Sequence, residues 1–146
     1  MKAMQDTDLA LLIDRFMRKI HFGLQSKAQS FDTERVGPGG GIVLLTLAEM
    51  GYPALNALTE RVARDKSQMT RTIRSLETIG LVARKPSQQD ARVTLVYLTE
   101  ASAGVVKGLK QAVTETISEV LAPITASQEA TLKALLERAL DDRDGG

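Results

Sequence analysis

Apolar residues recur at spacings of three and four along the first part of the chain. They are Leu9, Leu12, Ile13, Phe16, Ile20 and Leu24. This spacing predicts a helix from about residue 6 to residue 28, with one apolar face. The stretch Ser30–Gly41 is rich in turn residues and ends in three consecutive glycines, so it predicts a loop. Because glycine costs roughly 1 kcal/mol in a helix interior, we expect the next helix to start late, or its beginning to be mobile.

Two short helices are predicted after this loop. The apolar run Ile42–Met50 has a composition that favours a buried helix, and Gly51 and Pro53 follow it as stop signals. A second short helix fits Ala54–Ala63, because its leucine and valine residues fall on one face.

A further helix is predicted from Lys66 onward. Asp65 precedes it as a good N-cap, and Gln68 lies three residues later, as in a capping box. Gly80 follows the last helical residues and ends the helix. The apolar stripe of this helix consists of Met69, Ile73 and Leu76.

The pattern changes to alternating and β-branched residues after Gly80. Residues 81–85 form a plausible strand, and Val93–Leu98 form a clearer one. The segment Pro86–Ala91 between them is polar and turn-like, so the three segments together predict a hairpin.

Helical periodicity returns after the hairpin. Thr99 is a suitable N-cap for a helix that extends to Pro123, and Thr125, with Gln128 three residues later, starts the last helix. The order is four helices, two strands and two further helices. We therefore predict a mainly α fold, a winged helix-turn-helix, with long helices at both ends.

The polar face of the helix that begins at Lys66 carries arginines and hydroxyls but no acid. Arginine binds guanine edges or phosphates through two nitrogens, and the major groove of DNA is about 12 Å wide and admits a helix. The candidate DNA-binding residues on this helix are Lys66, Ser67, Gln68, Thr70, Arg71 and Arg74. The alternative is that this face is an ordinary solvated surface.

The distribution of charge favours DNA binding, although the total does not. The formal net charge of the 146 residues is only +1. Between Leu58 and Arg92, however, eight bases stand against four acids, which gives +4, and the rest of the chain sums to −3. The balanced total therefore hides a basic segment that coincides with the predicted winged module.

The predicted hairpin tip adds basic and amide side chains. The candidate DNA contacts here are Lys85, Gln88, Gln89 and Arg92. A hairpin tip can enter the minor groove, where arginine follows the negative potential. An acid at the tip would repel phosphate, so we expect Asp90 to structure the turn or to hold Arg92. The alternative for Arg92 is a simple exposed salt bridge with Asp90.

Five segments, taken in order, resemble the MarR family of winged-helix transcriptional regulators. Leu58–Val62 is similar to the first helix of the family's helix-turn-helix and Lys66–Ile73 to its recognition helix. Leu76–Arg84 is similar to the junction into the wing, Asp90–Arg92 to the D-x-R wing motif, and Leu98–Glu100 to the entry of the long fifth helix. The element order of the whole chain agrees with this resemblance.

The resemblance implies a homodimer, an operator of two DNA half-sites and commonly a small organic ligand that weakens DNA binding, as in a repressor. We therefore expect a single domain, 1–146, with a winged helix-turn-helix at 42–99 and dimerisation helices at 1–36 and 100–146. The candidate interface residues are Leu9, Ile13, Phe16, Leu132, Leu135 and Leu136. Alternatively, these residues pack only within the chain.

The amino-acid composition excludes several kinds of functional site. The chain has no cysteine and a single histidine, His21, so we expect no metal site, no cofactor, no thiol-based sensing and no catalytic residues. The longest uncharged stretch, Val36–Ala48, is too short to cross a membrane, and we expect a cytoplasmic protein. Three phenylalanines and a tyrosine could line a ligand pocket or simply pack: Phe16, Phe22, Phe31 and Tyr52.

The sequence is compatible with two main hypotheses of function. The first is a sequence-specific DNA-binding regulator. The second is a protein-interaction module or ligand-binding dimer on the same fold, because a fold does not fix a function. An enzyme is the most distant alternative.

Overall fold

A computed structural model describes residues 6–31 and 36–141, without the side chains of residues 29–31. Contacts between Cα atoms divide the chain into two compact units. We call residues 24–113 the winged unit, and residues 1–23 together with 114–146 the helical unit. Residues 32–35 of the loop predicted at Ser30–Gly41 and the side chain of Phe31 lie outside the described residues.

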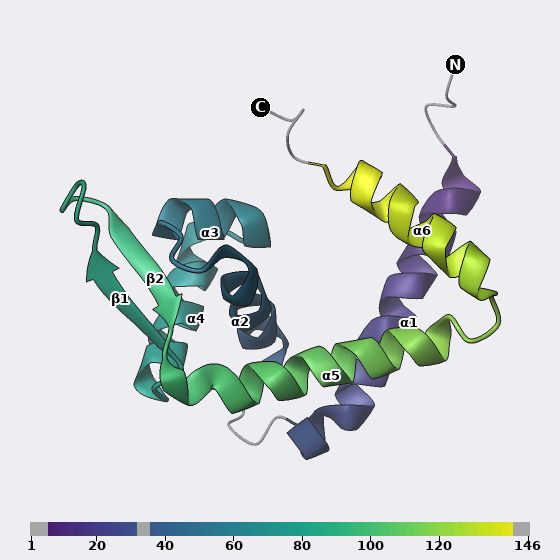
Figure 1. Cartoon of the computed structure of the whole chain (residues 1–146), viewed down its shortest axis with the longest axis horizontal. Coiled ribbons are helices and arrows are strands. Elements are labelled where there is room, and N and C mark those ends of the chain that lie inside the picture. Colours follow the sequence, from purple (N-terminus) through teal and green to yellow (C-terminus); the bar gives the residue numbers. More distant parts are fainter. Residues whose placement is uncertain (1–5, 32–35, 142–146) are drawn as a thin grey trace. The chain divides into compact units, whose positions relative to one another are not determined.

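The winged unit contains three short helices and a hairpin, in the predicted order (Figure 1). The helices are α2 (Gly37–Met50), α3 (Leu55–Val62) and α4 (Lys66–Thr78). The strands β1 (Val82–Pro86) and β2 (Thr94–Leu98) follow, and a 3₁₀ turn (Glu100–Ser102) leads into α5 (Ala103–Val120). Helix α2 contacts α3, α4 and β2, so it is the centre on which this unit is assembled.

The start of α2 differs from the prediction. The helix begins at Gly37 and includes Gly39, Gly40 and Gly41, which we expected to lie in a loop. A Cβ added to Gly40 would lie 2.6 Å from Cγ1 of Val36 and 3.4 Å from Cδ2 of Leu76. The absence of a side chain therefore lets this turn of α2 pack closely against α4. The low intrinsic helix propensity of glycine is overridden by this tertiary packing.

The turn between α3 and α4 places two caps next to each other. Ala63 adopts the left-handed conformation, with φ at 59°, and is the C-cap of α3. Asp65 is the N-cap of α4, as predicted, and its carboxylate accepts a 2.8 Å hydrogen bond from the backbone N–H of Gln68. This bond satisfies one of the backbone donors that the first turn of a helix leaves unpaired.

Strands β1 and β2 pair antiparallel, with Val82 opposite Leu98 and Pro86 opposite Thr94. The sequence did not predict that a segment outside the hairpin also pairs with β2. Ala54, just before α3, forms an isolated bridge with Leu95, and the backbone N–H of Val96 donates to the carbonyl of Pro53 at 2.9 Å. The base of the wing is therefore tied to the loop between α2 and α3.

Thr99 occupies an N-cap position, but not in the way we expected. Its hydroxyl donates a 2.6 Å hydrogen bond to the carbonyl of Gly80 instead of capping the helix that follows. The backbone N–H of Thr99 donates to the carbonyl of Leu81. These two bonds close the open end of the hairpin, and a 3₁₀ turn then precedes α5.

The winged unit encloses an aliphatic core. Its residues come from α2, α3, α4 and the hairpin, and the most buried are 0–3% exposed: Val43, Leu44, Leu47, Leu58, Met69, Ile73, Leu76, Leu81, Val82 and Val96. Val106 and Leu109 of α5 complete this cluster. The predicted stripe of α4 is therefore confirmed as the buried side of that helix.

The helical unit is formed by the first part of α1 (Thr7–Phe31), the end of α5 and α6 (Ala126–Ala139). Helices α1 and α5 approach closely at Gly23, where an added Cβ would lie 2.7 Å from Cγ2 of the buried Thr116. The predicted cap of the last helix is confirmed. Thr125 and Gln128 form both hydrogen bonds of a capping box.

Candidate nucleic-acid interface

Helix α4 has one buried face and one exposed face. Met69, Ile73 and Leu76 are at most 2% exposed and fix the orientation of the helix on the core. The predicted DNA-binding residues emerge on the other side. Lys66, Ser67, Gln68, Arg71 and Arg74 are exposed, and Thr70 is half-buried. The amphipathic pattern of the sequence therefore positions these polar groups together on one solvent-facing surface.

The three cations of α4, Lys66, Arg71 and Arg74, form no ion pair within the part of the chain that the structure describes. Their charges are therefore available to an external anion. Two other arginines of the basic segment are already paired: Arg61 lies 3.8 Å from Glu49, and Arg84 lies 2.9 Å from Glu77.

The pairing of Arg84 with Glu77 was not foreseen from the sequence. The side chains are 39% and 28% exposed, so solvent screens this bridge only in part. It joins the end of α4 to the first strand of the wing. Arg84 thus contributes to the position of the wing and less to the positive surface than the charge count suggested.

Two of the three threonine hydroxyls of α4 bond to the backbone of the helix itself. The hydroxyl of Thr70 donates to the carbonyl of Lys66 at 2.9 Å, and that of Thr78 donates to the carbonyl of Arg74 at 2.9 Å. This pattern is common for threonine within helices. The hydroxyl protons are therefore occupied, while their oxygens can still accept a hydrogen bond.

The hairpin tip is organised by Asp90. Its carboxylate accepts hydrogen bonds from the backbone N–H of Arg92 at 3.1 Å and from Nε and Nη2 of the same arginine at 3.1 and 3.3 Å. These bonds hold the pKa of Asp90 below its usual value, with the side-chain bond from Arg92 as the larger cause. The backbone N–H of Val93 also donates to the carbonyl of Asp90 at 2.9 Å.

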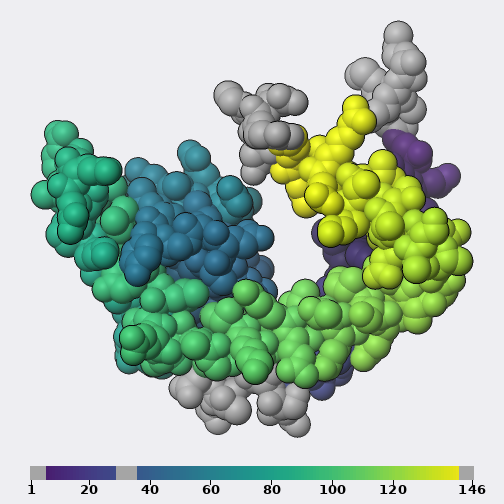
Figure 2. Space-filling model, in the orientation of Figure 1, coloured from purple at the N-terminus to yellow at the C-terminus, as the bar shows by residue number. Residues whose placement is uncertain are grey.

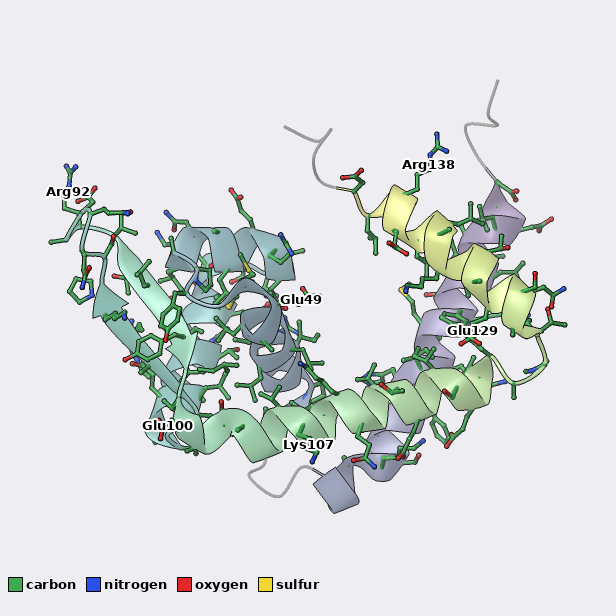
Figure 3. The ribbon with its side chains drawn as sticks, viewed as in Figure 1. Glu49, Arg92, Glu100, Lys107, Glu129 and Arg138 are labelled. Carbon is green, nitrogen blue, oxygen red and sulfur yellow. The ribbon has the colours of Figure 1, made fainter. Side chains whose placement is uncertain are left out.

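The Arg92 side chain remains accessible although it is bonded. It is 91% exposed and extends from the tip of the hairpin (Figure 3). The tip itself projects from the body of the winged unit (Figure 2). Gln88 and Gln89 are exposed in the same turn. The ion pair with Asp90 and contact with an external anion are thus compatible, since the pair uses only one edge of the guanidinium group.

Lys85 has aromatic neighbours that the sequence analysis did not connect with it. Its Nζ lies 4.7 Å from the ring centroid of Tyr52 and 5.2 Å from that of Tyr97. In the sequence, the alternation along β2 could have indicated that Tyr97 shares a face with Lys85. No sequence signal places Tyr52 there, because the loop that carries it is 33 residues away.

The helical unit presents apolar side chains to solvent. The predicted interface residues Leu9, Ile13 and Leu135 are 53%, 50% and 60% exposed, Leu136 is 49% exposed and Phe16 is 37% exposed. Leu132 is half-buried. It lines a groove of about 890 Å³ between the end of α5 and α6. These residues are therefore not buried by packing within the single chain.

Comparison with known proteins identifies the family. The model of the MarR family matches residues 42–94, from the core of α2 to the start of β2. An uncharacterised HTH-type transcriptional regulator of Mycobacterium bovis is 31% identical over 134 residues, which cover 92% of this chain and 89% of that protein. The chain belongs to the MarR family. It is a transcriptional regulator and not an enzyme.

Solved structures of MarR-family proteins share the fold. A cysteine-to-serine variant of MarR from Escherichia coli, in complex with operator DNA, has a TM-score of 0.75 at 26% identity and covers 92% of this chain and 94% of that one. PcaV from Streptomyces coelicolor, in complex with its natural ligand, has a TM-score of 0.69 over 97% of this chain and 98% of that one. At 23% identity, the second likeness shows the fold alone.

The described residues of this MarR-family chain contain neither a metal-binding cluster nor a helix that could span a membrane. In 6–31 and 36–141, no cluster of three or more acidic, histidine or cysteine side chains has the arrangement of a metal site. None of the helices in these ranges combines the length and apolar character that a membrane span requires. His21 is exposed on α1.

Proposed function

We propose that this protein is a homodimeric repressor that binds a DNA operator of two half-sites, each half-site contacted by α4 and the hairpin of one protomer. The observation that carries the proposal is the exposed row of cations on α4. Arg71 and Arg74 lie opposite the buried stripe and Lys66 lies at the start of the helix, and none of them forms an ion pair among the described residues. A helix with this face fits the major groove.

The hairpin supplies a second contact in this proposal. Arg92 is held by Asp90 at the tip, so less side-chain entropy is lost when it binds than for a mobile arginine. The minor groove and its flanking phosphates attract such a group. Gln88 and Gln89 add amide groups beside it. The base-reading role thus falls to α4 and the positioning role largely to the wing.

Dimerisation in this proposal uses the helical unit. Exposed apolar residues on α1 and α6 lose less contact with water if a second copy covers them. A two-fold dimer also matches an operator of two half-sites, because the symmetry of the protein and of the DNA then agree. We accordingly assign 42–99 to DNA binding, and 1–36 and 100–146 to dimerisation.

Relief of repression by a small organic ligand is the expectation that follows from the family. PcaV was solved in complex with its natural ligand, which shows that this fold can hold one. The present chain has no cysteine through which a thiol signal could act. We therefore propose non-covalent control by an organic molecule, in a regulator that works in the cytoplasm.

Selection of bound fragments from genomic DNA tests DNA binding directly. The protein should enrich a fragment with an inverted repeat, and affinity for that fragment should fall steeply as salt rises, because bound cations release counterions from DNA. Failure to enrich any fragment would contradict the proposal and favour a role in protein interaction.

Two substitutions connect binding to the candidate residues. Arg71→Ala should weaken operator binding roughly tenfold to a hundredfold, the cost of a lost bidentate base contact, and Arg92→Ala should weaken it less. Lys107→Ala is the matched control, because Lys107 is an exposed cation on α5 rather than on α4 or the hairpin (Figure 3). Wild-type affinity of both arginine variants in gel shifts would remove these residues from the interface.

The repressor role requires a measurement in cells. A reporter under the selected promoter should be expressed more strongly when the regulator gene is deleted, and a stable Arg71→Ala protein should fail to restore repression. Lower reporter expression on deletion would instead identify an activator. A screen of small organic molecules should then find compounds that release the protein from its operator.

A further inference from the structure

The side chains of Lys85, Tyr52 and Tyr97 form a cluster at the wing. The ammonium of Lys85 lies within 6 Å of both ring centroids, the distance at which a cation and an aromatic face attract each other. The two ring centroids are 5.1 Å apart and the rings are tilted by 30°. One cation therefore interacts with two aromatic rings at once.

The backbone explains how these residues meet. Lys85 pairs with Leu95 in the sheet and Ala83 pairs with Tyr97, so Lys85 and Tyr97 are diagonal neighbours on one face. Tyr52 comes from the loop between α2 and α3. Gly51 precedes it with φ at 81°, a conformation that favours glycine.

Two contacts fix the Tyr52 loop against β2. The carbonyl of Pro53 accepts a bond from the N–H of Val96, and Ala54 bridges to Leu95. Val96 and Leu95 are the residues immediately before Tyr97 in the strand. The loop is thus attached beside the ring of Tyr97, so the position of Tyr52 is set by the fold and not only by the attraction to Lys85.

The charge of Lys85 stays available in this arrangement. Lys85 forms no ion pair among the described residues, and its side chain is exposed. An aromatic face attracts the ammonium without accepting its protons as a carboxylate does, and an ammonium has three donors to offer. The rings restrict a flexible side chain while leaving it positive.

We infer that Tyr52 and Tyr97 are positioning residues that hold the Lys85 ammonium ready to bind a phosphate of the DNA backbone beside the wing. This inference rests on the proposed function. It assigns Tyr52, which lies outside both α4 and the hairpin, a part in DNA binding that it performs through Lys85. A phosphate is the expected ligand because the lysine ammonium is a compact point charge that pairs well with a phosphate. Such a contact does not depend on the base sequence.

Substitutions at Tyr52 separate the ring from the hydroxyl. Tyr52 is 58% exposed, so its replacement leaves the core intact. Tyr52→Leu should weaken binding roughly two- to fivefold, the range of a cation–π contact at an exposed site, while Tyr52→Phe should bind like wild type. The loss should be equal for the selected operator and for a duplex of scrambled sequence, because a phosphate contact is independent of sequence.

The salt dependence distinguishes a phosphate contact from a structural effect. Lys85→Ala should reduce the slope of log affinity against log salt concentration by about 0.9, one phosphate contact. In the Lys85→Ala background, Tyr52→Leu should cause no further loss. An equal loss from Tyr52→Leu with and without Lys85 would show that Tyr52 only stabilises the wing, and would overturn the inference.

A measurement without DNA examines the cluster itself. The ε-methylene protons of Lys85 should be shifted upfield by the rings in wild type and Tyr52→Phe, and less so in Tyr52→Leu. Wild-type shifts in the leucine variant would contradict the arrangement. Loss of affinity in Arg71→Ala but not in Lys85→Ala would overturn this inference alone, whereas a wild-type protein that binds no duplex would overturn the proposed function and the inference with it.

Discussion

The winged unit and the helical unit treat their apolar residues in opposite ways. In the winged unit, Leu44, Leu47 and Leu58 are at most 1% exposed, and α2, α3, α4, the hairpin and α5 contribute to a common core. In the helical unit, α6 has no buried residue, and Leu9, Leu135 and Leu140 are 53–73% exposed. Both units have helices with aliphatic side chains, yet only one of them encloses these side chains within the single chain.

The two units therefore differ in how they are stabilised. The winged unit removes its apolar surface from water by its own folding, at about 25 cal/mol for each Å² buried. The exposed face of α1 and α6 is the kind of apolar surface that marks a protein interface. The comparison therefore supports a dimer in which the helical unit is completed by a second copy and the winged unit is not.

The largest expected effect is a cavity in the core of the winged unit. Leu44→Ala removes a fully buried side chain and should lower the free energy of unfolding by about 2–5 kcal/mol. Ile42→Ala on the same helix is the control, because Ile42 is 44% exposed and should cost less than about 1 kcal/mol. Urea denaturation at one protein concentration measures both. Equal losses would mean that the two positions are buried alike in solution.

A charge on α6 should break the proposed dimer. Leu136 is 49% exposed in the single chain, and Leu136→Glu should raise the dimer dissociation constant by at least about 30-fold, the size of an interface hot spot. Arg138→Gln provides the control on the same helix. Analytical ultracentrifugation across a range of concentrations measures the change. An unaltered dimer in Leu136→Glu would separate α6 from the interface.

A glycine at position 63 should stabilise the winged unit alone. Ala63 has a φ of 59°, a conformation that costs roughly 1 kcal/mol for a residue with a Cβ. Ala63→Gly should therefore raise the free energy of unfolding of the winged unit by up to about 1 kcal/mol, without changing dimerisation. Urea denaturation and ultracentrifugation together measure this. A less stable variant would show that the left-handed cap is not strained.

The smallest expected effect concerns acid and the hairpin tip. The bonds from Arg92 lower the pKa of Asp90 from its ordinary value of 3.8, so the charged carboxylate favours the ordered tip. That contribution is present above pH 3.8 and is lost as the pH falls through the lower folded value. The Nε–H signal of Arg92 in NMR spectra should move over this range. Asp90→Asn should abolish the titration, whereas a transition centred above 3.8 would contradict the assignment.

The sequence predicts those features that depend on neighbours along the chain. The stripe of Met69, Ile73 and Leu76, the caps at Asp65 and Thr125 and the hairpin all follow from spacing and local hydrogen bonding. The element order and the mainly helical fold also follow from these local patterns, and the resemblance to the MarR family rests on short segments of the sequence. The DNA-contacting and interface residues stay predictions, although most of them are exposed, as the proposal requires.

Features that depend on distant neighbours were missed. A Cβ at Gly40 would lie 3.4 Å from Cδ2 of Leu76 on α4, and nothing in the local sequence reports that contact. The hydroxyl of Thr99 bonds a carbonyl 19 residues earlier, so its N-cap chemistry is not used. The Glu77–Arg84 ion pair and the cation–π contact between Lys85 and Tyr52 likewise depend on how the hairpin packs against the rest of the winged unit.

The hydrogen bond from the Thr70 hydroxyl to the carbonyl of Lys66 affects which DNA bases α4 can contact. With its proton committed, Thr70 presents an oxygen lone pair and a methyl group. A phosphate oxygen offers only lone pairs and cannot pair with such a group, whereas the amino groups of cytosine and adenine can donate to it and the thymine methyl can pack against it. On α4, Thr70 is thus chemically suited to discriminate bases, while the neighbouring lysine is suited to the sugar-phosphate chain.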